Sequence, residues 1–302
     1  MLNRTSRSRV GGPNVTGFFD PRTFSIQYVA ADPDTGRCAL IDPILDYDEK
    51  SGAIGTSSAD ALLDHVRAES LEVAWILDTH PHADHLTAMH YLKKQTGAPT
   101  AIGARVVEMQ ALWRDLYHLP PTFPVDGSQW DRLLREGDTF KIGDLEMRVL
   151  HSPGHTLASV TYVIGDAAFV HDTLFMPDSG TARADFPGGD ARSLWRSIQA
   201  LLTLPNDTRV FTGHDYQPAG RDPAWESTIG DQRRHNHHLA EASTEADFAS
   251  LRAARDRALP MPKLILHALQ VNVAAGRLPE PEANGRTYLK IPLGALGGAA
   301  WE

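Results

Sequence analysis

The alternation of apolar and polar side chains predicts strands along much of the chain. Residues 23–30 place apolar side chains at every second position, which is typical of a half-buried strand. The turn-forming residues 32–36 separate it from a second strand over residues 37–42, so the two form a hairpin. Short apolar runs predict further strands at these positions: 71–77, 100–102, 138–142, 145–150, 159–164, 167–170 and 208–212.

Apolar residues at helical spacing predict a second set of elements. Residues 193–203 are the clearest case, because Leu194, Ile198 and Leu201 fall on one face of an amphipathic helix. The other predicted helices cover these ranges: 59–68, 86–95, 106–117, 228–241, 246–258 and 263–274. Residues 46–57 and the Pro- and Gly-rich residues 278–293 are predicted as loops. The order of strands and helices suits an α/β (α+β) protein with two sheets and helices outside them.

One predicted helix has two possible interpretations. Residues 106–117 lead into a proline-rich run, and we interpret residues 105–136 as an insertion near the functional site. This insertion is either a lid over the site or a packed surface helix.

Composition describes an ordinary globular protein. Of 302 residues, 42% are hydrophobic and 22% are charged, and the net charge is −9. The negative charge and the lack of a basic block argue against nucleic-acid and membrane partners. No apolar run approaches the about 20 residues that span a bilayer. A single cysteine, Cys38, excludes an intrachain disulfide.

The N-terminus is rich in arginine and serine, and no apolar segment of the kind found in secretory signals follows it. We therefore predict a flexible tail over residues 1–17 and a cytoplasmic location. The single cysteine fits a reducing compartment of this kind.

Metal-ligating side chains follow the predicted strands. Three histidines and an aspartate lie within residues 80–85, directly after the apolar run 71–77. Single candidates follow three later strands, and loops at strand ends can converge on one point. The candidate ligands are His80, His82, Asp84, His85, His155, Asp172 and His214. Imidazole and carboxylate without thiolate suit Zn²⁺, Fe²⁺ or Mn²⁺.

The remaining histidines have less specific surroundings. His65, His90, His118 and His267 are interpreted as surface or structural residues, and residues 235–238 as the solvated face of a helix. The neighbours of the candidate ligands, His151 and His171, are assigned supporting roles.

The motif Thr79-His80-x-His82-x-Asp84-His85, together with His155, Asp172 and His214, resembles the metallo-β-lactamase superfamily. Residues 40–43, Leu-Ile-Asp-Pro, fit the opening of that fold. The resemblance covers most of residues 18–216 and implies a four-layer αββα sandwich with the metal at one edge. We expect residues 217–302 to form a helical extension that packs on this core within the same domain.

Within that superfamily the chain is most similar to the branch that contains glyoxalase II and the persulfide dioxygenases. The motif over residues 152–156 is general to that branch, whereas residues 180–186, 214–216, 277–281 and 290–292 are similar to the dioxygenases. The resemblance implies one Fe²⁺ held by His80, His155 and Asp172, with open positions for O₂ and a substrate sulfur. The implied reaction oxidises glutathione persulfide to sulfite and glutathione.

The resemblance also implies roles for residues around that iron. Asp84 is the candidate catalytic residue, and with His82, His85 and His214 it would form a polar layer that orients ligands and solvent. The residues expected to contact the glutathione moiety are Arg183, Tyr216 and Arg221, with Asp185 as the partner of Arg183. The chain departs from the dioxygenase pattern at Thr181, where those enzymes often have cysteine, and at Ala182 and Ala184.

Two other functions remain open. A glyoxalase II-like hydrolase of glutathione thioesters would hold two metals, such as zinc, bridged by Asp172. One metal would take His80, His82 and His155, and the other would take Asp84, His85 and His214. The second alternative function is a non-catalytic metal-binding protein in sulfur metabolism. Zn²⁺, one or two ions per chain, is the alternative to Fe²⁺. Family analogy allows a homodimer.

Overall fold

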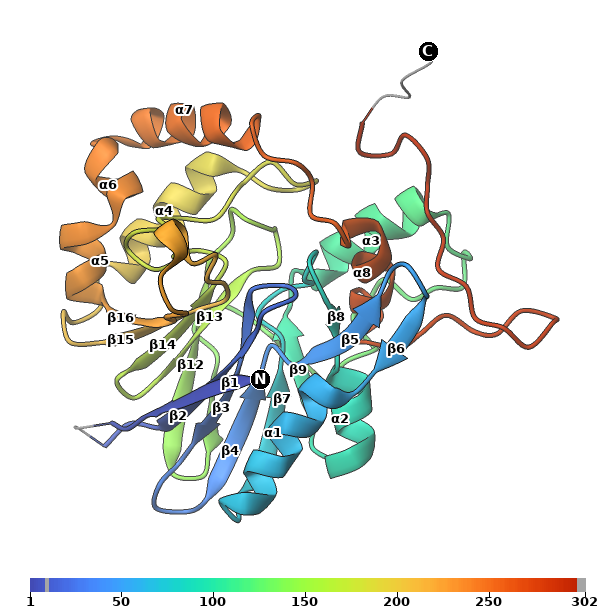
Figure 1. The fold of residues 1–302 in the computed structure, drawn as a ribbon, viewed down its shortest axis with the longest axis horizontal. Coiled ribbons are helices and arrows are strands. Elements are labelled where there is room, and N and C mark those ends of the chain that lie inside the picture. Colours follow the sequence, from blue (N-terminus) through green and yellow to red (C-terminus); the bar gives the residue numbers. More distant parts are fainter. Residues whose placement is uncertain (9–10, 298–302) are drawn as a thin grey trace.

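A computed structural model describes residues 1–8 and 11–297, and shows two β-sheets packed face to face between two layers of helices (Figure 1). The first sheet has seven strands, which in order of pairing are β1 (Leu2–Ser6), β2 (Asn14–Asp20), β3 (Ser25–Ala31), β4 (Arg37–Ile41), β7 (Glu72–Leu77), β9 (Thr100–Gly103) and β10 (Arg132–Leu134). The second has six: β11 (Thr139–Ile142), β12 (Leu145–His151), β13 (Val160–Ile164), β14 (Ala167–His171), β15 (Arg209–Thr212) and β16 (Glu226–Thr228). A small third sheet consists of β6 (Ala53–Gly55), β5 (Ile44–Asp48) and β8 (Leu86–Thr87).

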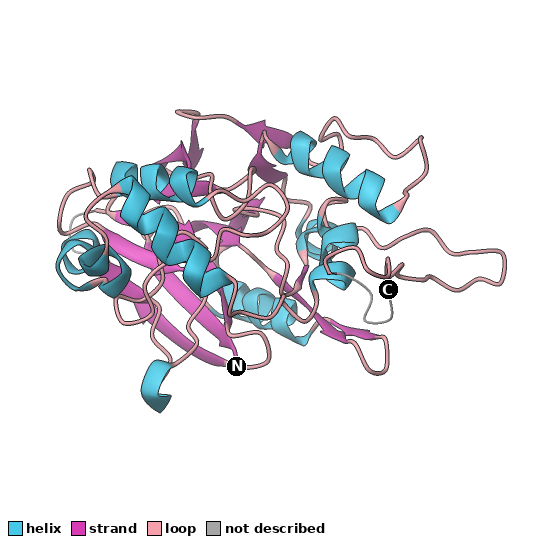
Figure 2. Ribbon diagram, turned by 90° about the horizontal axis from the view of Figure 1, so that it is seen from above, coloured by secondary structure: helices cyan, strands magenta, loops and turns pink. Residues whose placement is uncertain are grey.

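The helices divide between the outer faces of the two sheets (Figures 1 and 2). Those on the side of the first sheet are α1 (Ser57–Ala68), α2 (Met89–Thr96), α3 (Val106–Tyr117) and α8 (Ile265–Asn272). Those on the side of the second are α4 (Ala191–Leu201), α5 (Ile229–His235), α6 (His237–Glu241) and α7 (Glu245–Asp256). A 3₁₀ turn, η1, covers Pro218–Gly220. The predicted αββα sandwich is therefore confirmed.

Three layers of apolar side chains hold the sandwich together. Between the sheets, the rings of Tyr28, Phe169 and Phe211 contact one another with centroids 5.2–5.7 Å apart. A second layer lies under α1, α2, α3 and α8, and a third under α4, α5 and α7. Burial of this apolar surface is the main stabilising contribution to the fold. No helix among the described residues is long and apolar enough to cross a bilayer.

The prediction of a flexible tail over residues 1–17 is wrong for most of that range. β1 pairs antiparallel with β2 from Leu2 to Ser6, and β2 itself begins at Asn14. β1 is exposed along most of its length, so its side chains do not alternate in polarity and the sequence pattern does not predict it. Its pairing with β2 depends on main-chain hydrogen bonds. Residues 9–10 of that range, and 298–302 of the predicted extension, lie outside the described residues.

Three further differences concern predicted elements that change type or are interrupted. Part of the predicted loop 46–57 belongs to β5 and β6, which pair with each other. The helix predicted over 86–95 begins only at Met89, because Leu86 and Thr87 pair with β5 as strand β8. The helix predicted over 228–241 is interrupted at Asn236, whose side chain caps α6 by accepting a hydrogen bond from the Leu239 N–H.

The insertion around α3 is a packed helix and not a lid. Trp113 is 1% exposed and stacks on Tyr117, whose hydroxyl donates to the carbonyl of Leu266 in α8. Gln110 donates to the carbonyl of Val273 just after α8. These contacts join α3 to the C-terminal part of the chain, and none of its residues lines the large cavity described below.

Replacing Trp113 by alanine should therefore lower the free energy of unfolding by about 3–5 kcal/mol, since it empties a buried indole site. Leu112 on the same helix is 37% exposed, and its replacement by alanine should change that energy by less than about 0.5 kcal/mol. Denaturant titration of both variants measures the difference. Equal losses in the two variants would contradict the packed position of α3.

Candidate metal centre

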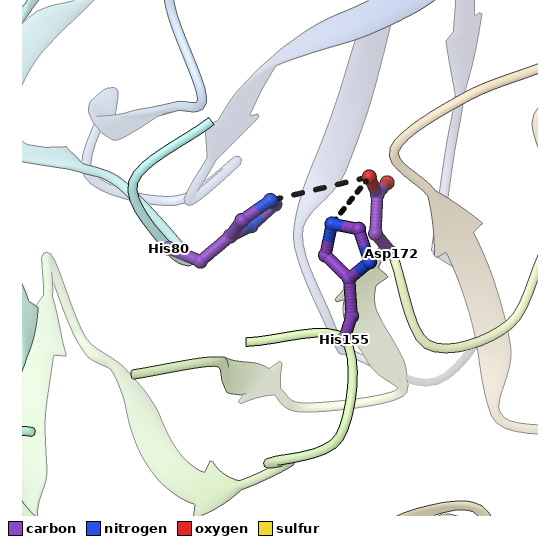
Figure 3. A group of neighbouring side chains, drawn as sticks. All are labelled: His80, His155 and Asp172. Carbon is purple, nitrogen blue, oxygen red and sulfur yellow. Dashed lines mark ion pairs between the residues drawn. The ribbon is translucent and has the colours of Figure 1, made fainter. Parts of the chain in front are cut away.

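The seven predicted ligands converge at one edge of the sandwich, because each follows a strand of one of the two sheets. His80 lies in the loop after β7, in the first sheet. His155, Asp172 and His214 follow β12, β14 and β15, in the second sheet. Figure 3 shows the side chains of His80 and His155 pointing toward the carboxylate of Asp172 from separate loops. The site thus depends on how the two sheets pack against each other.

His80, His155 and Asp172 form the tightest group. One ligand atom of each lies within 4.8 Å of the other two. The Nε2 atoms of His80 and His155 are 3.9 Å and 3.5 Å from Oδ2 of Asp172. All three side chains are buried, so they meet in a space with little access to bulk water. Two imidazoles and one carboxylate on one face form a ligand set typical of non-haem Fe(II) oxygenases.

A second group lies beside the first and is connected to Asp172 through His214. His82, Asp84 and His85 place one ligand atom each within 4.8 Å of one another. His214 Nε2 is 3.4 Å from Asp172 Oδ2 and 3.5 Å from Asp84 Oδ2, so it connects the two groups. The structure therefore brings all seven predicted ligands together.

Each histidine of the two groups is oriented by a hydrogen bond on the nitrogen that faces away from the centre. His155 Nδ1 and His85 Nδ1 donate to the carbonyls of Arg183 and Leu86, at 2.9 Å and 3.1 Å. His80 Nδ1 lies 3.1 Å from the hydroxyl of Thr79 and donates to it, because that hydroxyl gives its own proton to the carboxylate of Asp42. With their outer nitrogens protonated, these rings present a lone pair on the inner nitrogen.

Asp42 orients the fourth ring and was not predicted as a site residue. Its carboxylate accepts hydrogen bonds from the Thr79 N–H at 2.7 Å and from His82 Nε2 at 3.0 Å. The backbone of Asp42 has φ 51°, in the left-handed region that non-glycine residues rarely adopt. The motif Leu40-Ile41-Asp42-Pro43 marked this position in the sequence, but only the fold shows that it contacts His82.

The charges of the site suit a divalent cation. Burial and the neighbouring imidazoles hold the pKa of His80 well below its usual value, and burial also lowers the pKa of His155. Although burial acts to raise the pKa of Asp172, the imidazoles of His214 and His155 hold it well below its usual range. Neutral imidazole and ionised carboxylate are the forms that bind metal.

Two histidines hold a proton in the absence of a cation. Burial lowers the pKa of His82, but the carboxylate of Asp42 outweighs this and raises it to about 9. Asp172 likewise outweighs burial and holds the pKa of His214 well above its usual value. Binding a metal through either ring would release that proton.

Whether the residues fit a metal can be judged from the buried polar atoms that lack a hydrogen-bond partner. His80 Nε2, His82 Nδ1 and Asp172 Oδ1 are buried and have no hydrogen-bond partner among the described residues. An unpartnered polar atom in such a place is destabilising, and a cation in the first group would satisfy Nε2 of His80, whereas Nδ1 of His82 belongs to the second group. Gly213 leaves room for this carboxylate, since a Cβ there would lie 2.5 Å from Asp172 Oδ1. The residues therefore fit a metal ion.

A cavity of about 1110 Å³ opens onto the centre. Asp84, His155, Asp172 and His214 line it. Tyr216, predicted to contact substrate, lines it too; its ring stacks on His214 at an interplanar angle of 5°.

The two arginines predicted to contact substrate lie in different places. Arg183 lines the cavity and pairs with Asp185 at 2.6 Å, as expected, and also donates to the carbonyl of Pro260. Arg221 is not among the residues that line the cavity. Its guanidinium is bonded instead to the carboxylates of Asp178 and Asp215, so it joins two loops rather than facing the cavity.

The cluster over residues 235–238 corrects another prediction. His235 is exposed, but His238 is buried and its Nδ1 accepts a hydrogen bond from the Thr181 N–H at 2.9 Å. Burial and Arg252 lower the pKa of His238 to about 3, so the ring is neutral and can act as that acceptor. No local pattern signals this role, because the contact joins segments 57 residues apart.

Comparison with known proteins agrees with this geometry. A protein of Xylella fastidiosa (strain Temecula1) described as a beta-lactamase hydrolase-like protein is 67% identical over 295 residues, which cover 98% of this chain and 68% of that protein. Glyoxylase B2 of Dictyostelium discoideum is 44% identical, covering 89% of this chain and 93% of its own. The mitochondrial persulfide dioxygenase ETHE1 of Mus musculus is 27% identical, covering 85% and 87%.

Comparison of the fold with solved structures shows a similar relative. The crystal structure of ETHE1 from Myxococcus xanthus superposes with a TM-score of 0.69 and 29% sequence identity, covering 92% of this chain and all of that one. The model of the metallo-β-lactamase superfamily matches residues 23–214, the range that carries all seven ligand candidates. The chain therefore belongs to the metallo-β-lactamase superfamily.

Proposed function

We propose that this protein is a metal-dependent sulfur dioxygenase, which oxidises glutathione persulfide with O₂ at a single Fe²⁺. The observation that carries the proposal is the compact group of His80, His155 and Asp172, whose ligand atoms lie within 4.8 Å of one another. His82 falls outside that group and donates from Nε2 to Asp42. A two-histidine, one-carboxylate set leaves positions free for O₂ and a sulfur ligand.

The surroundings of the second group support a single metal. Asp84 accepts a hydrogen bond from the Ser25 hydroxyl at 2.6 Å and lies beside His214, so its carboxylate already has protein partners. The likeness to ETHE1 from Myxococcus xanthus, and to a named persulfide dioxygenase, points in the same direction.

The overall reaction converts glutathione persulfide, O₂ and water into glutathione, sulfite and two protons. Iron held by His80, His155 and Asp172 would supply the redox chemistry. Asp84 lines the cavity, and its pKa is held well below its usual range by His214 and His85 against the effect of burial. Asp84 therefore stays ionised and can accept a hydrogen bond from a proton donor in the cavity.

Other residues of the chain limit what reaches the centre. The ligands are buried at the base of the cavity, and Tyr216 and Phe24 contact each other where they line it. The Arg183 carbonyl orients His155, and its side chain is held by Asp185. Arg183 would therefore position His155 through its carbonyl, while its side chain lines the cavity.

A hydrolase of glutathione thioesters with two metals is the second candidate function. The buried Nδ1 of His82 has no hydrogen-bond partner among the described residues, as expected of a ligand. His82, Asp84 and His85 form a second compact group, and Asp172 lies between the groups. In this reaction water and a thioester give an acid and a thiol. The 44% identity to Glyoxylase B2 also favours it.

Metal content and substrate separate the two functions. Protein purified without added metal should contain about one iron per chain by elemental analysis, since three residues form the compact set. With glutathione persulfide it should consume O₂ at an oxygen electrode. Two zinc ions per chain, together with hydrolysis of S-lactoylglutathione and no O₂ uptake, would replace the first candidate by the second.

Two ligand variants give a further test. His155→Ala should lose the metal, because it removes one of three ligands. The loss of metal affinity should exceed the about 10–100-fold that follows removal of a residue that only hydrogen-bonds to a ligand. His85→Ala should keep one iron per chain under the first candidate. Elemental analysis of both, with His90→Ala in α2 as the control, measures the outcome. Loss of one of two metals in His85→Ala would support the hydrolase.

A further inference from the structure

We propose that Asn272, the last residue of α8, is a positioning residue for the metal-binding loop. This inference rests on the proposed metal centre but not on which reaction occurs there. The Asn272 side chain is 1% exposed and lies against the loop that follows β7. Its Nδ2 donates to the carbonyls of His82 and His85, both at 2.8 Å, and its Oδ1 accepts from the Thr87 N–H at 2.9 Å.

These contacts use both N–H donors and the acceptor oxygen of the side chain on one loop. An asparagine amide has two N–H donors, and here each meets the carbonyl of a candidate ligand. Fixing these two carbonyls fixes the peptide planes at both ends of the segment from His82 to His85. The direction of a side chain follows from the backbone that carries it, so Asn272 sets where His82, Asp84 and His85 point.

The loop is held from its other side by the small sheet. Leu86 and Thr87 pair as β8 with β5, and the Ala88 N–H donates to the carbonyl of Pro43. The loop therefore lies between β5 and α8, and its shape does not depend on a bound metal. A centre that is already formed before the metal arrives binds it more tightly, because less conformational entropy is lost.

α8 is a rigid support for this contact. Its buried face belongs to the apolar layer under the first sheet, and both Gln110 and Tyr117 of α3 bond to carbonyls in or just after it. The chain after α8 approaches the loop so closely that a Cβ at Gly276 would lie 2.8 Å from the carbonyl oxygen of Thr87. Asn272 thus cannot move away from the loop without moving the helix.

Gln270 of the same helix offers a matched control. It is 5% exposed, and its Nε2 donates to the carbonyls of Leu266 and Lys290 while its Oε1 accepts from the Lys290 N–H. Gln270 therefore makes the same kinds of hydrogen bonds as Asn272, but to its own helix and to the C-terminal segment instead of the metal-binding loop. Loss of either side chain should destabilise the fold by a similar amount.

The test compares Asn272→Ala and Asn272→Asp with Gln270→Ala and Gln270→Glu in the full chain after chelation. Titration with Co²⁺ gives the Kd, and thermal unfolding gives the stability of each metal-free variant. The Asn272 variants should bind Co²⁺ about 10–100-fold more weakly than wild type. The Gln270 variants should bind with the wild-type Kd despite a similar loss of Tm. Unchanged Kd in both Asn272 variants would overturn the proposal.

A measurement on the wild-type chain does not depend on the folding of any variant. Hydrogen exchange at the Thr87 amide should be slow in the metal-free protein, since Asn272 Oδ1 already accepts its proton. Fast exchange that becomes slow only with Co²⁺ would show that the metal orders the loop, and would also overturn the proposal. Wild-type protein that bound no Co²⁺, in contrast, would remove the metal centre and the proposed function with it.

Discussion

The metal centre depends on hydrogen bonds to the nitrogens that its histidines turn outward. Thr79, Asp42 and the carbonyl of Arg183 each accept a hydrogen bond from one of these nitrogens. In His80 and His155 the remaining nitrogen is then a lone-pair donor inside a buried space, and that of His80 has no hydrogen-bond partner among the described residues, which is destabilising. The same contacts that orient the rings therefore create the demand for a cation. Loss of an outer partner should therefore weaken metal binding by about 10–100-fold, although less than loss of a ligand.

Two of these partners, Asp42 and the carbonyl of Arg183, come from segments that contribute no ligand. The segment that carries Arg183 is held by the helices after His214: the Thr181 N–H donates to His238, and the Ala184 N–H donates to Asp256. Asp256 is in turn paired with the buried Arg252. The C-terminal helices thus fix the loop whose carbonyl orients His155. Their packing against both outer faces of the sandwich connects the stability of the fold to the geometry of the centre.

Much of the architecture could be predicted from local patterns. Strand alternation, short apolar runs and helical spacing placed most elements, including α3 to the residue. The spacing of the ligand candidates at strand ends identified the centre, because loops at one edge of a sheet lie near one another, although the ligands of the two sheets meet only when the sheets pack face to face. Prediction failed for β1 and for the break at Asn236, where main-chain pairing and one side-chain cap decide the structure. Neither leaves a periodic pattern in the sequence.

The sequence by itself determined which residues can bind a metal and that they lie together, since ligand chemistry and strand order are local properties. Only the tertiary structure decided how these residues divide into two groups, and that Arg221 joins two loops while Tyr216 lines the cavity. It also decided that His238 is buried and that Asn272 contacts the metal-binding loop. The physical reason is that hydrogen bonds between segments up to 190 residues apart in the chain depend on how helices and sheets pack, and local sequence does not encode that packing.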